Sequence, residues 1–212
     1  RRCRRSSKTK SGKRGPEMSE PRPSVVILAG PNGAGKSTAA PALLQGALAV
    51  DEFVNADVIA RGLSAFEPDR VAIAAGRIML ARLDELAAQR VDFAFETTLA
   101  TRSFAPWLRG LTLSGYDVHL FFLWLSSADL AVARVADRVR AGGHHVPEAV
   151  VRRRYSAGIR NFFRLYQRLA ATWAVYNASG APPALMAEGL ASETIGVYDK
   201  SVWQAVQRQG TV

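Results

Sequence analysis

Val25-Val26-Ile27-Leu28-Ala29-Gly30-Pro31-Asn32-Gly33-Ala34-Gly35-Lys36-Ser37-Thr38 is the stretch that decides the fold class of this chain. Its five aliphatic residues lead into a loop that fits G-x-x-x-x-G-K-[ST] from Gly30 to Ser37. This pattern is typical of a buried strand, a phosphate-binding loop and the start of a helix. It indicates a nucleoside-triphosphate site rather than a chance glycine-rich turn.

Each part of the loop suits a bound phosphate. Its glycines let the backbone turn with N–H groups pointing inward, where side chains would collide with phosphate oxygens. The helix that follows directs the positive end of its dipole at the same anion. Lys36 supplies a charge for the β- and γ-phosphates, and Ser37 offers a hydroxyl to Mg²⁺. We therefore predict that ATP and Mg²⁺ are bound by Gly30, Pro31, Asn32, Gly33, Ala34, Gly35, Lys36, Ser37 and Thr38.

The length and composition fit one α/β domain. The chain has 212 residues, of which 48% are hydrophobic, so it can bury a sizeable core. The longest apolar run, residues 119–125, is too short to span a bilayer. The single cysteine, Cys3, allows no internal disulfide and fits a reducing compartment, so a cytoplasmic location is expected.

Positive charge is concentrated near the N-terminus. The net charge is +10, and residues 1–17 hold eight basic side chains against the single acid Glu17. Such a segment is compatible with a nucleic-acid or membrane-surface arm, a solvated extension, or a stretch upstream of a true start at Met18. We favour the last two together. We expect residues 1–20 to be a disordered basic tail and residues 21–212 to be a P-loop kinase-like domain.

The remaining sequence alternates between strand and helix patterns. Strands are expected at residues 24–29, 53–57, 91–98, 117–125, 184–187 and 194–198. Helices are expected at 35–45, 68–89, 104–113, from Ser126 or Ser127, at 148–177 and at 199–207, with a surface connection at 61–69. The alternation predicts a three-layer α/β fold of the P-loop NTPase type, with a mostly parallel central sheet and a helical lid beside Gly142-Gly143.

Two carboxylates are expected at the carboxyl ends of strands, the edge where ligands bind in open α/β sheets. Asp57 is predicted to take the proton of an attacking hydroxyl; holding a Mg²⁺ water or capping a turn are the alternatives. Glu96 is expected to face the cleft, because a buried unpaired Glu is costly. It is predicted to act either as a metal-associated acid or as an acceptor for a substrate hydroxyl, with Thr98 beside it.

Arginines flank the Gly142-Gly143 joint. We expect Arg138 and one of Arg152, Arg153 and Arg154 to reach the triphosphate, with Arg152 as the substrate-binding candidate. The alternative is a solvated basic face. His144 is a candidate for a hydrogen bond to phosphate or substrate, because it and His145 lack a third ligand for a structural metal site.

Taken in order, several motifs resemble the zeta toxin family, most closely the branch labelled predicted ABC-type ATPases. They are Gly30–Thr38, Asn55-Ala56-Asp57, Phe95-Glu96-Thr97-Thr98, Gly142-Gly143-His144-His145-Val146-Pro147 and Arg152-Arg153-Arg154-Tyr155, and the resemblance covers roughly residues 24–187. It implies a P-loop kinase that uses ATP and Mg²⁺ to phosphorylate the 3′-hydroxyl of the amino sugar of UDP-N-acetylglucosamine, held in check by an antitoxin.

The resemblance also implies residue roles. Asp57 falls on the catalytic base, Arg138 on a phosphate-clamping arginine, and Lys36 and Ser37 on the phosphate and Mg²⁺ positions. Glu96 and Thr98 fall on contacts to the sugar nucleotide. The family has a second clamping arginine, and the nearest position in this chain is His144. Arg140 or Arg152 would then take the role of that arginine. An acid that contacts substrate in the family falls near Met79 or Leu80.

These patterns favour a small-molecule kinase with a nucleotide-sugar-like acceptor. The alternative from another class is a nucleotide-dependent switch or a nucleic-acid-associated ATPase that uses the basic tail. A third is a phosphate-binding protein that acts through a partner with little catalysis.

Overall fold

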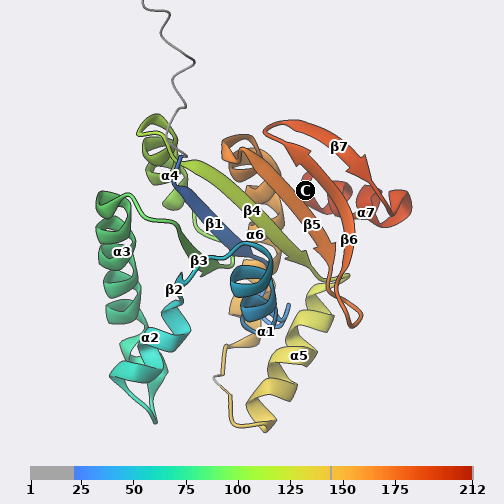
Figure 1. Cartoon of the computed structure of the whole chain (residues 1–212). Helices are drawn as coiled ribbons and strands as arrows, with labels where there is room; N and C mark the ends of the chain where they lie inside the picture. The colour runs from blue at the N-terminus through green and yellow to red at the C-terminus, as the bar shows by residue number, and fades with distance from the viewer. Residues whose placement is uncertain (1–21, 144, 212) are drawn as a thin grey trace, which may run out of the picture.

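Seven strands form one central sheet in the computed structural model, which describes residues 22–143 and 145–211. The strand order is β2-β3-β1-β4-β5-β6-β7 (Figure 1). The first five strands in this order are parallel, and β6 and β7 are antiparallel additions at one edge. The strands are β1 (Ser24–Ala29), β2 (Glu52–Val54), β3 (Phe93–Thr97), β4 (Asp117–Trp124), β5 (Thr172–Asn177), β6 (Ala184–Leu190) and β7 (Glu193–Val197).

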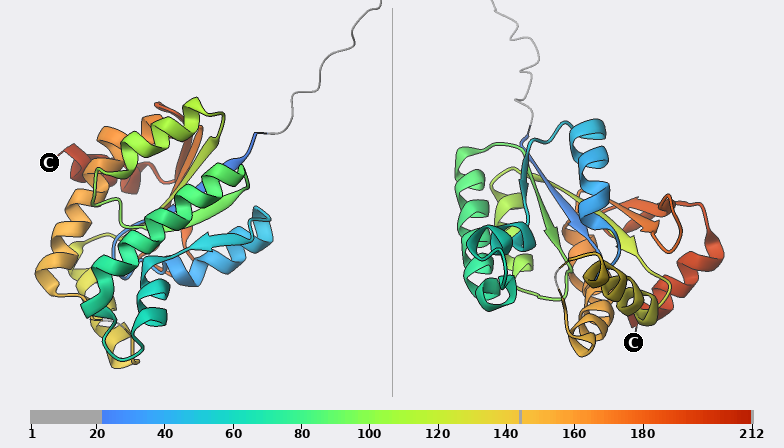
Figure 2. Two further views of the ribbon diagram at one scale, coloured as in Figure 1. Left: turned by 90° about the vertical axis from the view of Figure 1, so that its left-hand side faces the viewer. Right: turned by 90° about the horizontal axis from the view of Figure 1, so that it is seen from below.

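Helices cover both faces of this sheet (Figure 2). They are α1 (Lys36–Ala40), α2 (Ala56–Leu63), α3 (Ala72–Gln89), α4 (Phe104–Leu113), α5 (Ala128–Arg140), α6 (Glu148–Asn161) and α7 (Lys200–Thr211). The predicted three-layer P-loop NTPase fold with a mostly parallel sheet is confirmed. No helix within residues 22–143 or 145–211 is long and apolar enough to cross a membrane.

Aliphatic and aromatic side chains fill the space between the layers. Val25 to Ala29 of β1 are at most 2% exposed, as expected for a parallel strand covered on both faces. On one face, Phe95 contacts Phe104 of α4 with ring centroids 5.1 Å apart. Further along that sheet, Trp173 stacks on Trp203 of α7 at 5.7 Å. Burial of these rings holds the helices against the sheet.

The helix predicted at residues 148–177 is wrong in its last part. After α6 the chain forms one π-helical turn (Phe162–Tyr166) and a short 3-10 turn (Gln167–Leu169), and it then enters β5, which pairs with β4. Trp173 and Tyr176 continue the helical spacing of the aromatic residues before them, but they belong to the sheet. Pairing with β4 and β6 outweighs this local pattern, and β-branched and aromatic residues suit a buried strand.

The second strand is shorter than predicted, and Asp57 does not belong to it. β2 ends at Val54, because the Asn55 side chain caps α2 and accepts hydrogen bonds from the backbone N–H groups of Asp57 (2.8 Å) and Val58 (3.2 Å). Asp57 therefore lies in the first turn of α2. The surface connection predicted at 61–69 is wrong in its first residues, since α2 continues to Leu63.

Pro41 changes the geometry of the first helix. The chain is α-helical from Lys36 to Ala40 and π-helical from Pro41 to Ala47. Proline has no N–H to donate to the carbonyl four residues earlier, so the regular α-helical ladder cannot continue through it. The helix expected at 35–45 is therefore present, but it is wider in its second half. The predicted tail and His144 lie outside the described residues.

Candidate functional site

The phosphate-binding loop begins with Gly30, which packs closely between β3 and β4. Gly30 has φ 142°, and its N–H donates to the Thr97 carbonyl of β3 (3.2 Å). A Cβ atom at this position would lie 2.3 Å from the Leu123 carbonyl oxygen of β4. Neither the backbone conformation nor the available space accepts a side chain, so the sequence requires glycine here.

Gly30→Ala is therefore expected to destabilise the protein by about 3 kcal/mol or more, the range of the most damaging point mutations. The midpoint of urea unfolding measures this. Gly62→Ala is the matched control, because Gly62 lies in α2 and a Cβ atom there would have nothing within 4 Å. At this position, alanine should stabilise the helix by up to about 1 kcal/mol. An unchanged midpoint for Gly30→Ala would contradict the close approach of the loop to β4.

Lys36 lies folded back over the loop. Its side chain is 6% exposed, and Nζ donates to the carbonyl oxygens of Gly30 (2.9 Å) and Pro31 (3.0 Å). Nζ also lies 3.5 Å from Glu96 Oε1. Burial lowers the pKa of Lys36, while the charges of Glu96 and Asp57 act in the opposite direction. The two carboxylates thus help to retain an ammonium group in a largely buried position.

Glu96 is tied to the phosphate-binding loop. Its Oε2 accepts hydrogen bonds from Ser37 Oγ (2.8 Å) and Asn55 Nδ2 (2.7 Å). This follows from the strand order: β3 neighbours β1, and Glu96 lies opposite Leu28, two residues before Gly30. The hydroxyl and carboxylate oxygens fit Mg²⁺, which is usually held by one or two carboxylates, waters and substrate phosphates. Within the described residues, no group of three or more His, Cys, Asp or Glu forms an all-protein metal cage.

Two cavities meet at this point, and they share Asn32, Lys36, Asp57 and Glu96. The phosphate-loop cavity, about 340 Å³, is completed by Gly33, Gly35, Ser37, Thr38, Arg134, Asp137 and Arg138. The threonine cavity, about 330 Å³, is completed by Asn55, Ala56, Gly76, Met79, Thr97, Thr98, Thr101, Phe104 and Arg154. A group in one cavity would therefore face a group in the other across Lys36 and the two carboxylates.

Asn32 contributes an acceptor that the described residues leave unsatisfied. The residue is 7% exposed, and its Oδ1 is buried without a hydrogen-bond partner in the described structure. Leaving such an atom unpaired costs about 1–3 kcal/mol. Asn32 lines both cavities, so this unsatisfied acceptor belongs to a residue of the candidate site.

The structure separates the candidate arginines. Arg138 lines the phosphate-loop cavity. Arg152 lines neither cavity in the described structure and instead pairs with Glu148 (2.8 Å) and Asp129 (2.6 Å). Arg154 is the member of the 152–154 run that lines the threonine cavity. Burial lowers its pKa, and the charge of Asp57 opposes that shift.

Most of the predicted site residues lie around a single edge of the sheet, but Arg152 lines neither cavity in the described structure and His144 lies outside the described residues. Thr98 lines the threonine cavity with Glu96 and Asp57. Of the predicted loop residues, the phosphate-loop cavity is lined by Asn32, Gly33, Gly35, Lys36, Ser37 and Thr38. Met79 also reaches the threonine cavity, and its thioether adds an apolar surface. The sequence missed Asn55, whose amide joins Glu96 to the start of α2. Its position directly before a helical pattern was the available signal.

Comparison with known families agrees with this architecture. Residues 25–172 match the family model AAA_33, described as an AAA domain. The chain therefore belongs to the AAA_33 family. One relative of this AAA_33 domain is an uncharacterized protein of Haemophilus influenzae, 29% identical over 131 residues that make up 62% of this chain and 91% of that protein.

Solved structures share the fold of this AAA_33 domain. A chain of the AvrRxo1-ORF1:AvrRxo1-ORF2 structure with sulphate ions has a TM-score of 0.70 and 17% identity, covering 87% of this chain and 63% of that one. A chain from the PezAT chromosomal toxin–antitoxin system of Streptococcus pneumoniae has a TM-score of 0.60 and 13% identity, covering 92% and 88%. A putative kinase from Chloroflexus aurantiacus has a TM-score of 0.52 and 18% identity, covering 62% and 79%.

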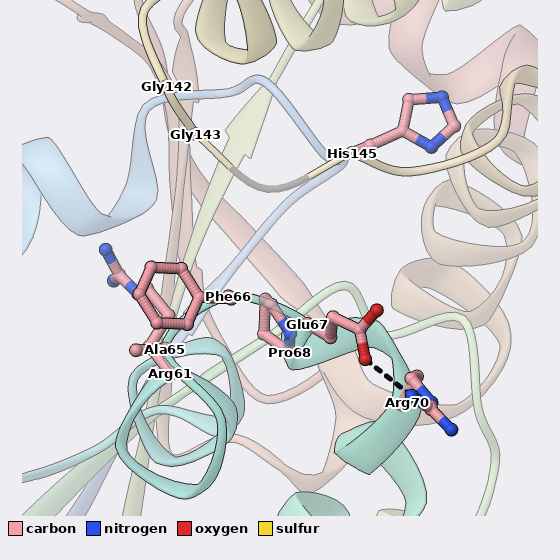
Figure 3. A pocket seen from close by; sticks show the side chains of 9 residues that line it. All are labelled: Arg61, Ala65, Phe66, Glu67, Pro68, Arg70, Gly142, Gly143 and His145. Carbon is pink, nitrogen blue, oxygen red and sulfur yellow. Dashed lines mark hydrogen bonds and ion pairs between the residues drawn. The ribbon is translucent and has the colours of Figure 1, made fainter.

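A third cavity in the AAA_33 domain has a volume of about 440 Å³ and shares no lining residue with the other two (Figure 3). This distal cavity is lined by Arg61, Ala65, Phe66, Glu67, Pro68, Arg70, Gly142, Gly143 and His145. Arg61 follows Asp57 by one turn of α2, and its Nε donates to the Asp57 carbonyl (3.3 Å). The Phe66 ring is 98% exposed, and no pattern in the sequence indicated it. The His145 ring points away from Phe66 and Arg61 (Figure 3).

Proposed function

We propose that this protein is an ATP- and Mg²⁺-dependent kinase that phosphorylates a hydroxyl group of a small molecule. The observation that carries the proposal is the pair of adjoining cavities, one built on a phosphate-binding loop and the other on threonine hydroxyls. Both are bordered by Lys36, Asp57 and Glu96. This arrangement suits transfer between two bound molecules better than hydrolysis in an open cleft, because each reactant has its own compartment.

The residues divide the chemistry between them. The triphosphate lies in the phosphate-loop cavity, where Lys36 and Arg138 stabilise the charge on the transferring group. Mg²⁺, when bound, neutralises charge on the β- and γ-phosphates. Asp57 accepts the proton of the acceptor hydroxyl as its oxygen forms a bond to the γ-phosphorus and the bond to the β-phosphate oxygen breaks, leaving ADP.

The sequence predicts that Glu96 is either a metal-associated acid or an acceptor for a substrate hydroxyl, and we propose that it is the metal-associated acid. The support is its hydrogen bond from Ser37 Oγ (2.8 Å), the hydroxyl expected to contact the metal. This role differs from the sugar-nucleotide contact that the resemblance implies. We propose that Thr98 contacts the sugar nucleotide, as the resemblance implies. We propose Arg154, in place of Arg152, as the arginine that faces the acceptor.

The acceptor is best matched by a hydroxylated ring that carries an anionic substituent. Three threonines and Arg154 line the threonine cavity, together with the apolar residues Met79 and Phe104. UDP-N-acetylglucosamine fits this description, and the motifs shared with zeta toxins support it. The PezAT structure comes from a toxin–antitoxin system, and we include an antitoxin-like protein partner in this proposal.

Incubation of the purified protein with Mg-ATP and a bacterial metabolite extract tests the general proposal. Mass spectrometry is expected to detect at least one metabolite that gains a phosphate only when both ATP and the protein are present. UDP-N-acetylglucosamine alone is the second substrate to try. ATP consumption that is equally fast without any extract, with no phosphorylated product, would indicate an ATPase instead of a kinase.

We propose that the nucleobase of such an acceptor reaches the distal cavity and stacks on the exposed Phe66 ring. Phe66→Ala is then expected to weaken binding of UDP-N-acetylglucosamine about tenfold, because stacking of a nucleobase on an aromatic side chain contributes about 1–3 kcal/mol. The half-saturating ATP concentration should not change. Leu113→Ala is the control, since Leu113 is an exposed apolar residue at the end of α4 and outside the three cavities. Equal acceptor binding by the two variants would exclude the distal cavity as the site of the nucleobase.

A further inference from the structure

We propose that Asn161 and Tyr166 are positioning residues for the acceptor, because they clamp residues 98–101 onto α6 and the turn that follows it. These four residues belong to the loop 98–103 that connects β3 to α4, and Thr98 and Thr101 line the threonine cavity. The clamp is a geometric feature of the fold; its effect on an acceptor rests on the kinase function proposed above.

Two buried side chains make the clamp. Asn161, the last residue of α6, is 4% exposed, and its Nδ2 donates to the carbonyl oxygens of Leu99 (2.8 Å) and Ala100 (3.2 Å). Tyr166 closes the π-helical turn, and its hydroxyl donates to the Thr101 carbonyl (2.7 Å). Three consecutive carbonyl groups of the loop are thus held by side chains more than 60 residues away in the sequence.

The helix backbone approaches the same loop closely. A Cβ atom at Gly158 would lie 2.4 Å from the Thr98 carbonyl oxygen, so α6 packs directly on the loop at this point. Arg154 lies one turn earlier on α6 and lines the threonine cavity. Because the helix and the loop are joined in this way, the Arg154 guanidinium and the threonine hydroxyls belong to one rigid wall.

The loop conformation needs this support. Leu99 is fully buried with φ 53°, a left-handed conformation that costs a non-glycine residue of order 1 kcal/mol. Its N–H donates to Thr97 Oγ1 (3.1 Å), which is a local contact only. Strained conformations persist where the surroundings determine them. Without the hydrogen bonds from α6, the loop would relax and the acceptor would lose its prearranged hydroxyl groups.

Asn161→Leu and Tyr166→Phe test the clamp, with Tyr198→Phe as a control for loss of a tyrosine hydroxyl at the far edge of the sheet. The bacterial metabolite extract serves as the acceptor source, and its concentration is varied at saturating ATP. We expect the half-saturating extract concentration to rise about tenfold in Asn161→Leu and about threefold in Tyr166→Phe, the effect of lost hydrogen bonds. Half-saturating ATP should stay the same in all variants.

Hydrogen exchange gives a readout that does not depend on activity. The amides of residues 99–101 should exchange faster in both clamp variants and not in Tyr198→Phe. A lower unfolding midpoint with unchanged exchange and unchanged acceptor dependence would overturn the inference and leave a structural role alone. Tyr166→Phe, which removes one oxygen atom, decides the matter if Asn161→Leu does not fold. If the wild type phosphorylates nothing in the extract, the kinase function fails, and exchange still tests the clamp.

Discussion

Asp57→Asn is expected to lower the rate of phosphoryl transfer about 10²- to 10⁴-fold, the usual contribution of a positioned general base. The substitution keeps the size of the side chain and removes its capacity to take a proton. Asp57 lies in the first turn of α2, where its backbone N–H is bonded to Asn55, and it borders both cavities. Since the hydrogen bond from the backbone stays, we expect α2 and the ATP affinity to be unchanged.

Product formation from the metabolite extract measures this effect, and binding of a fluorescent ATP analogue checks the nucleotide site. Asp51→Asn is the control for loss of one negative charge, because Asp51 is exposed and precedes β2. Its transfer rate should equal that of the wild type. Transfer within twofold of the wild type in Asp57→Asn would remove Asp57 as the base and leave it the alternative role of holding a Mg²⁺ water.

The sequence predicted most accurately those features whose causes are local. An aliphatic run followed by glycines encodes β1 and the phosphate-binding loop, and Ser127 caps α5 as expected, accepting from the Leu130 N–H (3.1 Å). In contrast, β5 depends on neighbouring strands that lie far away in the sequence. Its aromatic residues also fit a helix, so periodicity alone could not identify it.

The site residues also divide into those that the sequence pattern predicts and those that depend on distant parts of the chain. Lys36, Ser37, Asp57 and Glu96 lie together because the order of the strands brings the ends of β1, β2 and β3 to one edge. Which arginine faces the site depends instead on how α6 is rotated. The contact between Gly158 and the Thr98 carbonyl sets that rotation, and it directs Arg154 to the cavity rather than Arg152. No local pattern in the sequence carries this information.

Lys36→Met is expected to reduce transfer at least about 10²- to 10³-fold, comparable to the loss of one donor that stabilises charge in a transition state. ATP affinity should fall as well, because Lys36 is the one lysine among the described residues that line the phosphate-loop cavity. Lys200→Met, an exposed substitution in α7, should alter neither property. Product formation and binding of the ATP analogue are the two measurements.

The pH dependence of the free energy of unfolding shows whether Lys36→Met loses transfer because the ammonium group is gone or because the protein is unfolded. Burial lowers the pKa of Lys36 in the folded protein below its ordinary value of 10.5, so the unfolded chain binds this proton more tightly. The wild type should therefore gain stability from Lys36 as the pH rises from the lowered pKa toward 10.5. Lys36→Met should lack this gain while it stays folded at neutral pH, because Glu96 keeps its hydrogen bonds from Ser37 and Asn55. Normal transfer in a folded Lys36→Met protein would refute the proposed donor site.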